Sequence, residues 1–325
     1  MAGAVVHTKF FDDCLKDCNI NQCNSGNNCN IYSQGHDLLL YIETWNFIKN
    51  RQISLILSNY KFQEFIYNYL KEAKRNGSIY ETEDVKLFIY GYISHHILDS
   101  YFHPFIMQYC EDYLPSKNKA WLHGTIETLY DSSFITEYYK EDPLKFKLYK
   151  NLQYTKVKNP NFISNINQAG IDTYNINCLG KKINIAFHSM DKYMHLYRYD
   201  PRNFKKFIGR IYDKFTSMGS ETFFYTGENI EELEKYKNSE NKEWVNYWSK
   251  NQEHVIKSKE GLDDLYKHAL DITSRIIIDL EEVIKYSKIN FNDIIDIIPN
   301  TSAITGMECG TELPFIKKKR GIRYE

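Results

Sequence analysis

A long apolar stretch in the first half of the chain carries three metal-ligand side chains at regular intervals. Residues 83–113 are apolar on more than one face and predict a central, buried helix. Within it, His95, Asp99 and His103 are four residues apart and share one helix face. No Lys or Arg occurs between residues 87 and 115, so Asp99 has no cationic partner nearby in sequence. Because burying an unpaired carboxylate is costly, a bound cation is the economical explanation.

A second set of ligands follows on the next predicted helix, residues 121–140. His123 and Glu127 repeat the four-residue spacing, and Asp131 extends the same face by one turn. This mixture of imidazole and carboxylate suits zinc. Asp131 is either a further ligand or a carboxylate that orients a ligand histidine. His96 lies off the ligand face of the first helix, by about 100° on an ideal helix, and is interpreted as packing or as support for a ligand.

The rest of the chain also has helical periodicity, and strand-like alternation is scarce. Further helices are predicted at residues 53–74, 183–199, 201–218 and 262–286. We therefore expect an all-α, multi-helix bundle. The predicted organisation is a metal-binding helical core at 1–156, an Asn-rich linker or long loop at 157–182, and additional C-terminal helices at 183–325 that pack on the core.

Charge and hydropathy argue against two classes of protein. The formal net charge of -1 offers no electrostatic case for binding nucleic acid. No stretch approaches the roughly 18 consecutive apolar residues of a transmembrane helix. Residues 1–7 also lack the basic start and apolar run of a signal peptide. These features predict a soluble protein with an intracellular, cytoplasmic location.

The order of these motifs along the chain resembles that of the zinc-dependent phospholipase C family. The motifs are a histidine near the start (His7), Gly35-His36-Asp37, His95 with Asp99 and His103-Pro104-Phe105, and His123 with Glu127. The chain is most similar to the uncharacterised, non-secreted branch of that family. The resemblance implies a mostly helical enzyme with up to three zinc ions in a cleft. Fungal single-strand nucleases share this architecture.

The resemblance also implies a role for each ligand. One zinc ion would be held by His103, His123 and Glu127, a second by Asp37, His95 and Asp99, and a third by His7, Asp99 and the processed amino terminus. Asp37 is the candidate for activating the attacking water, and Asp37 and Glu127 are the candidate catalytic residues. One departure concerns the second ion: no histidine occurs between residues 38 and 94, where the family commonly has a ligand. His36 is the candidate substitute, and the expected zinc content ranges from one ion to three.

The leading functional hypothesis is phospholipase C-type cleavage of a phospholipid headgroup by metal-activated water. The substrate is expected to be a phospholipid or another phosphodiester, and transient contact with a membrane surface is compatible with that role. A zinc-dependent nuclease on the same scaffold is one alternative, although the near-neutral charge disfavours it. The other is a catalytically weak structural or binding protein that the metal stabilises.

Overall fold

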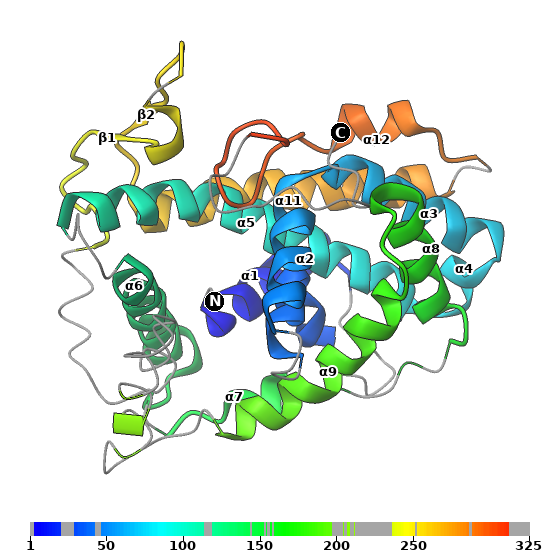
Figure 1. Cartoon of the computed structure of the whole chain (residues 1–325), viewed down its shortest axis with the longest axis horizontal. Coiled ribbons are helices and arrows are strands. Elements are labelled where there is room, and N and C mark those ends of the chain that lie inside the picture. Colours follow the sequence, from blue (N-terminus) through cyan, green and yellow to red (C-terminus); the bar gives the residue numbers. More distant parts are fainter. Residues whose placement is uncertain are drawn as a thin grey trace.

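The computed structural model describes most of the chain, and the described part is almost entirely helical (Figure 1). The described residues are 3–20, 29–42, 47–113, 119–143, 145–152, 154, 157, 159–196, 204, 207–208, 211, 236–250, 252–285 and 288–311. The elements are α1 (Ala4–Asp17), η1 (Cys29–Tyr41), α2 (Phe47–Asn59), α3 (Phe62–Arg75), α4 (Ser78–Glu81), α5 (Glu83–Tyr113), α6 (Lys119–Phe134), η3 (Ile135–Tyr139), α7 (Leu148–Asn151), α8 (Phe162–Tyr174), α9 (Leu179–Leu196), β1 (Trp244–Val245), η6 (Tyr247–Ser249), β2 (Lys257–Ser258), α11 (Leu262–Lys285) and α12 (Phe291–Ile297). The two short strands pair antiparallel. The all-α prediction is confirmed.

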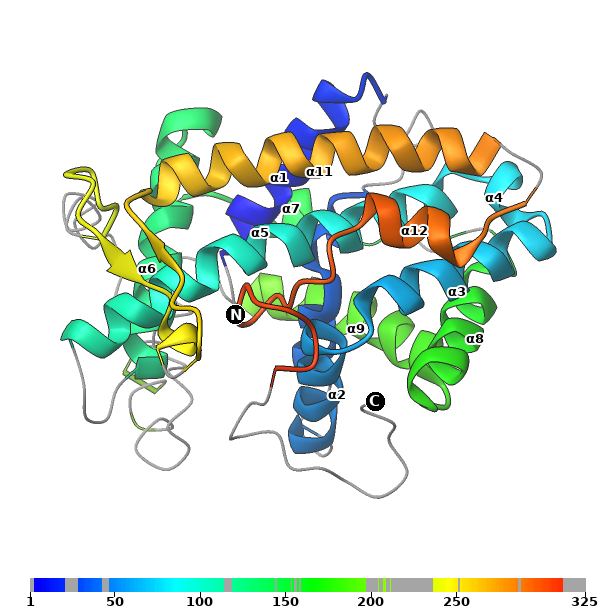
Figure 2. The same ribbon diagram turned by 90° about the horizontal axis from the view of Figure 1, so that it is seen from above.

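The central helix is α5, and its predicted bounds, 83–113, are confirmed. It contacts α1, η1, α6 and α11, so neighbours cover it on several sides. Figures 1 and 2 both show α11 running beside α5 along the length of the molecule. This enclosure explains why α5 is apolar on more than one face. It also means that the polar side chains of α5 must find their partners on other helices.

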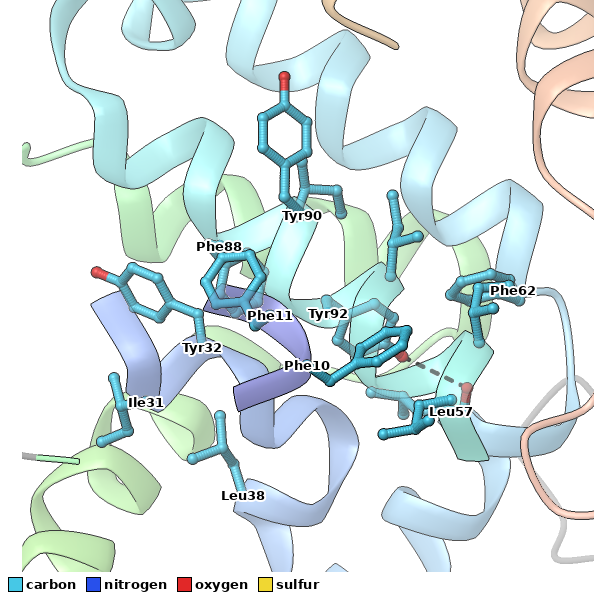
Figure 3. Packing of buried hydrophobic residues seen from close by; sticks show 14 of the residues in the cluster. Phe10, Phe11, Ile31, Tyr32, Leu38, Leu57, Phe62, Phe88, Tyr90 and Tyr92 are labelled. Atoms are coloured by element: carbon cyan, nitrogen blue, oxygen red, sulfur yellow. Dashed lines mark hydrogen bonds between the residues drawn. The ribbon is translucent and has the colours of Figure 1, made fainter. Parts of the chain in front are cut away.

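Large aromatic side chains fill the space around α5 (Figure 3). Phe10, Phe62, Phe88 and Tyr92 are each at most 1% exposed. The hydroxyl of Tyr92 donates a hydrogen bond of 3.4 Å to the carbonyl oxygen of Leu57, so the polar end of this buried ring has a partner. Packing of this kind holds the middle of α5 in place, immediately before its run of ligand side chains.

The structure corrects the prediction of a linker at residues 157–182. Most of this segment is helical, because it contains α8 and the start of α9. Buried Asn165 donates to the hydroxyl of Ser78 at 2.8 Å and accepts from the side chain of Asn76 at 2.7 Å. Tyr174 donates to the carbonyl of Tyr60 at 2.8 Å. The segment is therefore packed structure, and Asn165 serves within it as a buried hydrogen-bonding group.

A second correction concerns residues 53–74, which the periodicity predicts as one helix. The structure divides them between α2 and α3 at Lys61, whose φ of 53° is left-handed. The short α2 then contacts η1, while α3 contacts α8 and α12. The break thus lets one apolar stretch line two sides of the core.

Helix α11 packs on α1 and α5, and α12 packs on α3. On α11, Glu281 accepts hydrogen bonds from Lys86 at 3.0 Å and from Tyr90 at 2.8 Å, both on α5. The loop after α12 reaches the same helix, where Gly306 (φ 62°) lies against Pro104 and the carbonyl of Ser100. Pro104 has no N–H to offer this carbonyl. Among the described residues, no helix is both long and apolar enough to cross a membrane.

Candidate metal centre

Four elements bring the predicted ligands together. His7 comes from α1, the Gly-x-Asp motif from η1, the central set from α5 and the last pair from α6. Within the described part of the chain, three groups have ligand atoms that all lie within 4.8 Å of one another: His7, His95 and Asp99; His36, Asp37 and His95; and His103, His123 and Glu127. Every predicted side-chain ligand therefore belongs to a group, whereas the amino terminus lies outside the described residues. The third group has the composition that the family resemblance implied.

Asp99 lies at the centre of the cluster. Its Oδ1 is 3.1 Å from Nε2 of His7 and 3.8 Å from Nε2 of His103. Its Oδ2 is 3.2 Å from Nε2 of His95 and 4.0 Å from Nε2 of His36. Each carboxylate oxygen thus faces a different pair of histidines. This is the arrangement that a carboxylate bridging two cations requires.

Two histidines on α5 are oriented by backbone carbonyls. Nδ1 of His95 donates to the carbonyl of Ser33 at 3.0 Å, and Nδ1 of His103 donates to the carbonyl of Ala303 at 2.7 Å. Because a carbonyl only accepts, the proton of each neutral ring is held on Nδ1 and the lone pair lies on Nε2. Both Nε2 atoms face the carboxylates. Metal-binding histidines are commonly fixed in this way.

Several buried atoms of the cluster have no hydrogen-bond partner. They are Nδ1 of His7, both ring nitrogens of His36, Nε2 of His95 and Oδ2 of Asp99. Buried polar atoms without a partner are rare in proteins, and these five lie close together, whereas most of the others in the described residues are scattered. Imidazole nitrogens and carboxylate oxygens together are zinc ligands. The residues present therefore fit a zinc cluster.

His36, the candidate substitute for the absent histidine, belongs to the second ligand group with Asp37 and His95. It is 4% exposed, and its Nδ1 is 3.3 Å from Oδ1 of Asp37. The chain reverses sharply just before it, because Gly35 has φ 48° and ψ -132°. A Cβ at this position would lie 2.5 Å from the ring of His95, so only glycine lets η1 approach α5 so closely. The Gly-x-Asp motif thus has a steric reason as well as a chemical one.

Asp131 supports the cluster through the backbone of α1. Its Oδ1 accepts a hydrogen bond of 2.9 Å from the backbone N–H of Val6, next to His7. A Cβ at Gly3 would lie 2.2 Å from the same oxygen, so the start of α1 is held tightly against α6. Asp131 belongs to none of the three ligand groups in the described residues. It positions His7 by capping the first turn of its helix.

His96 is a packing residue, one of the two roles expected for it. Its ring stacks on Phe62 with centroids 3.5 Å apart and an interplanar angle of 5°. Its Nε2 lies 2.7 Å from the carbonyl of Thr301. Burial lowers the pKa of His96 to about 3, so the ring is neutral at physiological pH.

The carboxylates and histidines of the cluster shift one another's pKa values. Burial alone would raise the pKa of Asp99, but His103, His95 and His7 hold it well below its usual range. Burial likewise opposes ionisation of Glu127, but His123 and His103 keep its pKa low. Both carboxylates are therefore ionised at neutral pH. In the metal-free protein, the carboxylates raise the pKa values of His95 and His103, and protons on these two rings provide compensating positive charge.

Zinc binding should become tighter as the pH rises. Burial would lower the pKa of His103, but the Asp99 and Glu127 carboxylates outweigh it and raise this pKa to about 9. A zinc ion must displace that proton, so affinity should rise about tenfold per pH unit up to roughly pH 9. Competition titrations with a zinc chelator across this range measure the slope. Calorimetry in buffers of different ionisation enthalpy should show proton release, and a slope of zero would contradict the assignment of His103 as a ligand.

The more exposed ligands lie on η1 and the two helices of the third group. The side chains of Asp37, His103 and His123 are 15%, 16% and 19% exposed. Those of His7 and Asp99 are only 3% and 2% exposed. A small cavity of about 10 Å³ adjoins these two buried ligands and has room for roughly one water molecule. Solvent therefore has access to the cluster near Asp37, His103 and His123.

No family model, curated protein or solved structure matches the chain. Two contributors have no sequence signal of their own: the backbone carbonyls of Ser33 and Ala303. The carbonyl of Ala303 belongs to the loop that follows α12.

Proposed function

We propose that this protein is a zinc-dependent phosphodiester hydrolase that cleaves a phospholipid headgroup in the manner of phospholipases C. The observation that supports this most directly is the set of three adjacent ligand groups arranged around the shared carboxylate of Asp99. A single structural ion needs only one closed group of four ligands. Adjacent groups with an exposed edge are typical of sites that act on phosphate esters.

The proposed roles follow from position. His103, His123 and Glu127 would hold the most exposed ion, and Asp99 would join this position to the buried groups of His7 and His95. Zinc bound there would lower the pKa of water and neutralise charge on phosphoryl oxygens. Asp37 would receive the proton of the attacking water. Burial opposes the ionised form of Asp37, but the neighbouring His36 imidazole keeps its pKa low, so its carboxylate is free of a proton at neutral pH.

Replacing Glu127 with Gln tests this function. The substitution preserves volume but removes the charge that lies 2.6 Å from Nε2 of His123. Hydrolysis of phosphatidylcholine or phosphatidylinositol should fall by at least about 100-fold, because the most exposed zinc position loses a ligand. The matched control is Glu282→Gln on the exposed side of α11, which should leave activity unchanged.

The same assay separates the alternative functions. A wild-type protein that cleaves single-stranded DNA but no phospholipid would be a nuclease on this scaffold. A zinc-containing protein that hydrolyses neither, and in which Glu127→Gln lowers only thermal stability, would be a metal-stabilised structural protein. Either result would rule out the phospholipase assignment.

A further inference from the structure

Exposed apolar side chains form a row in the region between α9 and β1. Four of them are helical: Phe204, Phe207, Ile208 and Ile211. Their relative exposures are 63%, 58%, 50% and 43%, in that order. The spacing i, i+3, i+4, i+7 places all four on one helix face. Elsewhere in the described residues, exposed large apolar side chains are scattered singly or, at Val255 and Ile256, lie as a neighbouring pair.

The sequence around this face is basic. Between residues 201 and 218 there are five basic side chains and one acidic one: Arg202, Lys205, Lys206, Arg210, Lys214 and Asp213. The whole chain has a net charge of only -1, so this stretch carries far more positive charge than the chain as a whole. Phe215 continues the apolar spacing in the sequence. A helix with an apolar face and a Lys- and Arg-rich remainder is typical of helices that lie in the plane of a membrane interface.

We propose that the face formed by Phe204, Phe207, Ile208 and Ile211 docks on an anionic lipid surface. Apolar side chains would enter the interface while the basic side chains of the same stretch attract anionic headgroups. A second copy of the chain is a poorer occupant, because a two-fold contact would bring this basic stretch against its own copy. Charge complementarity therefore favours lipid over self-association.

The position of the face agrees with such a role. The described residues 204, 207–208 and 211, drawn in yellow-green, lie on the side of α6 (Figure 1). Helix α6 carries His123 and Glu127 of the most exposed ligand group. Docking would bring that side of the protein to the lipid surface. This inference rests on the proposed function, which gives the reason why the protein would bind lipid. Binding to vesicles is nevertheless measured independently of catalysis.

Co-sedimentation of the full chain with vesicles tests the proposal. We expect association with phosphatidylcholine vesicles that contain phosphatidylglycerol, weaker association with pure phosphatidylcholine, and a decrease with added salt. The double variant Phe204→Ser/Phe207→Ser should reduce association at least tenfold. Lys205→Glu/Lys206→Glu should reduce association with the anionic vesicles by about tenfold or more. The matched control Ile278→Ser/Ile295→Ser, at exposed positions on α11 and α12, should bind as the wild type does.

Other outcomes would overturn the proposal. Unchanged vesicle binding by Phe204→Ser/Phe207→Ser would show that this face is not the lipid contact. So would a wild-type dimer, detected by light scattering, that the same variant dissociates, since the face would then cover a second copy. Hydrolysis of a water-soluble, short-chain phosphodiester keeps the two proposals separate. The double variant should retain that activity, whereas vesicle binding without any hydrolysis would refute the proposed function and leave the docking surface intact.

Discussion

Replacing Asp99 with Asn should nearly abolish both zinc binding and phosphodiester hydrolysis. Each oxygen of Asp99 faces a different pair of histidines, at 3.1 and 3.8 Å on one side and 3.2 and 4.0 Å on the other. Asn keeps the shape but loses the charge and one of the two acceptor oxygens. The loss therefore affects more than one ion, and activity should fall by more than about 100-fold. Zinc content by mass spectrometry and hydrolysis of phospholipid measure the two effects.

A control with the same chemistry is available on α11. Asp279 is exposed there, so Asp279→Asn should change neither zinc content nor activity. The expected order of zinc content is wild type equal to Asp279→Asn, with Glu127→Gln lower and Asp99→Asn lowest. If Asp99→Asn kept the full zinc content, Asp99 would not be a bridging ligand, and the three groups would bind independently or not at all.

Removing the metal should destabilise the whole protein. The cluster joins α1, η1, α5 and α6, and it contains buried atoms with no hydrogen-bond partner. A ligand present at about a thousand times its dissociation constant stabilises a protein by roughly 4 kcal/mol. For a chain of this size the corresponding decrease in Tm on chelation is about 6 °C. Differential scanning calorimetry before and after chelation, followed by addition of zinc, measures the difference and its reversal.

The decrease in Tm on chelation should also depend on pH. In the metal-free protein, the raised pKa of His103 gives stability that is fully present below the unfolded value of about 6.5. That contribution decreases as the pH rises through about 9. The decrease in Tm on chelation should therefore be larger at high pH than near neutrality. A Tm that chelation leaves unchanged at every pH would mean that no metal contributes to the fold.

Helices were predicted correctly where the apolar pattern along the sequence was sufficient. They were missed where burial depended on partners far away in the sequence. Helix α5 was predicted with its observed bounds because it is buried on several sides and almost continuously apolar. The linker at 157–182 was wrong because asparagine usually favours loops. In the structure, Asn165 is buried and has hydrogen bonds to Ser78 and Asn76, residues that lie more than eighty positions earlier in the chain. A composition argument has no access to such partners.

The sequence by itself determined which side chains carry the chemistry and which pairs share a helix face. The spacing of His95, Asp99 and His103, and of His123 and Glu127, depends only on the helical repeat. Tertiary structure decided how these faces meet, that His36 joins Asp37 and His95, and that the carbonyls of Ser33 and Ala303 orient two rings. These contacts join residues far apart in the chain, and backbone carbonyls are the same at every position. No periodicity or residue type records them, so only the packing of α1, η1, α5 and α6 could produce the site.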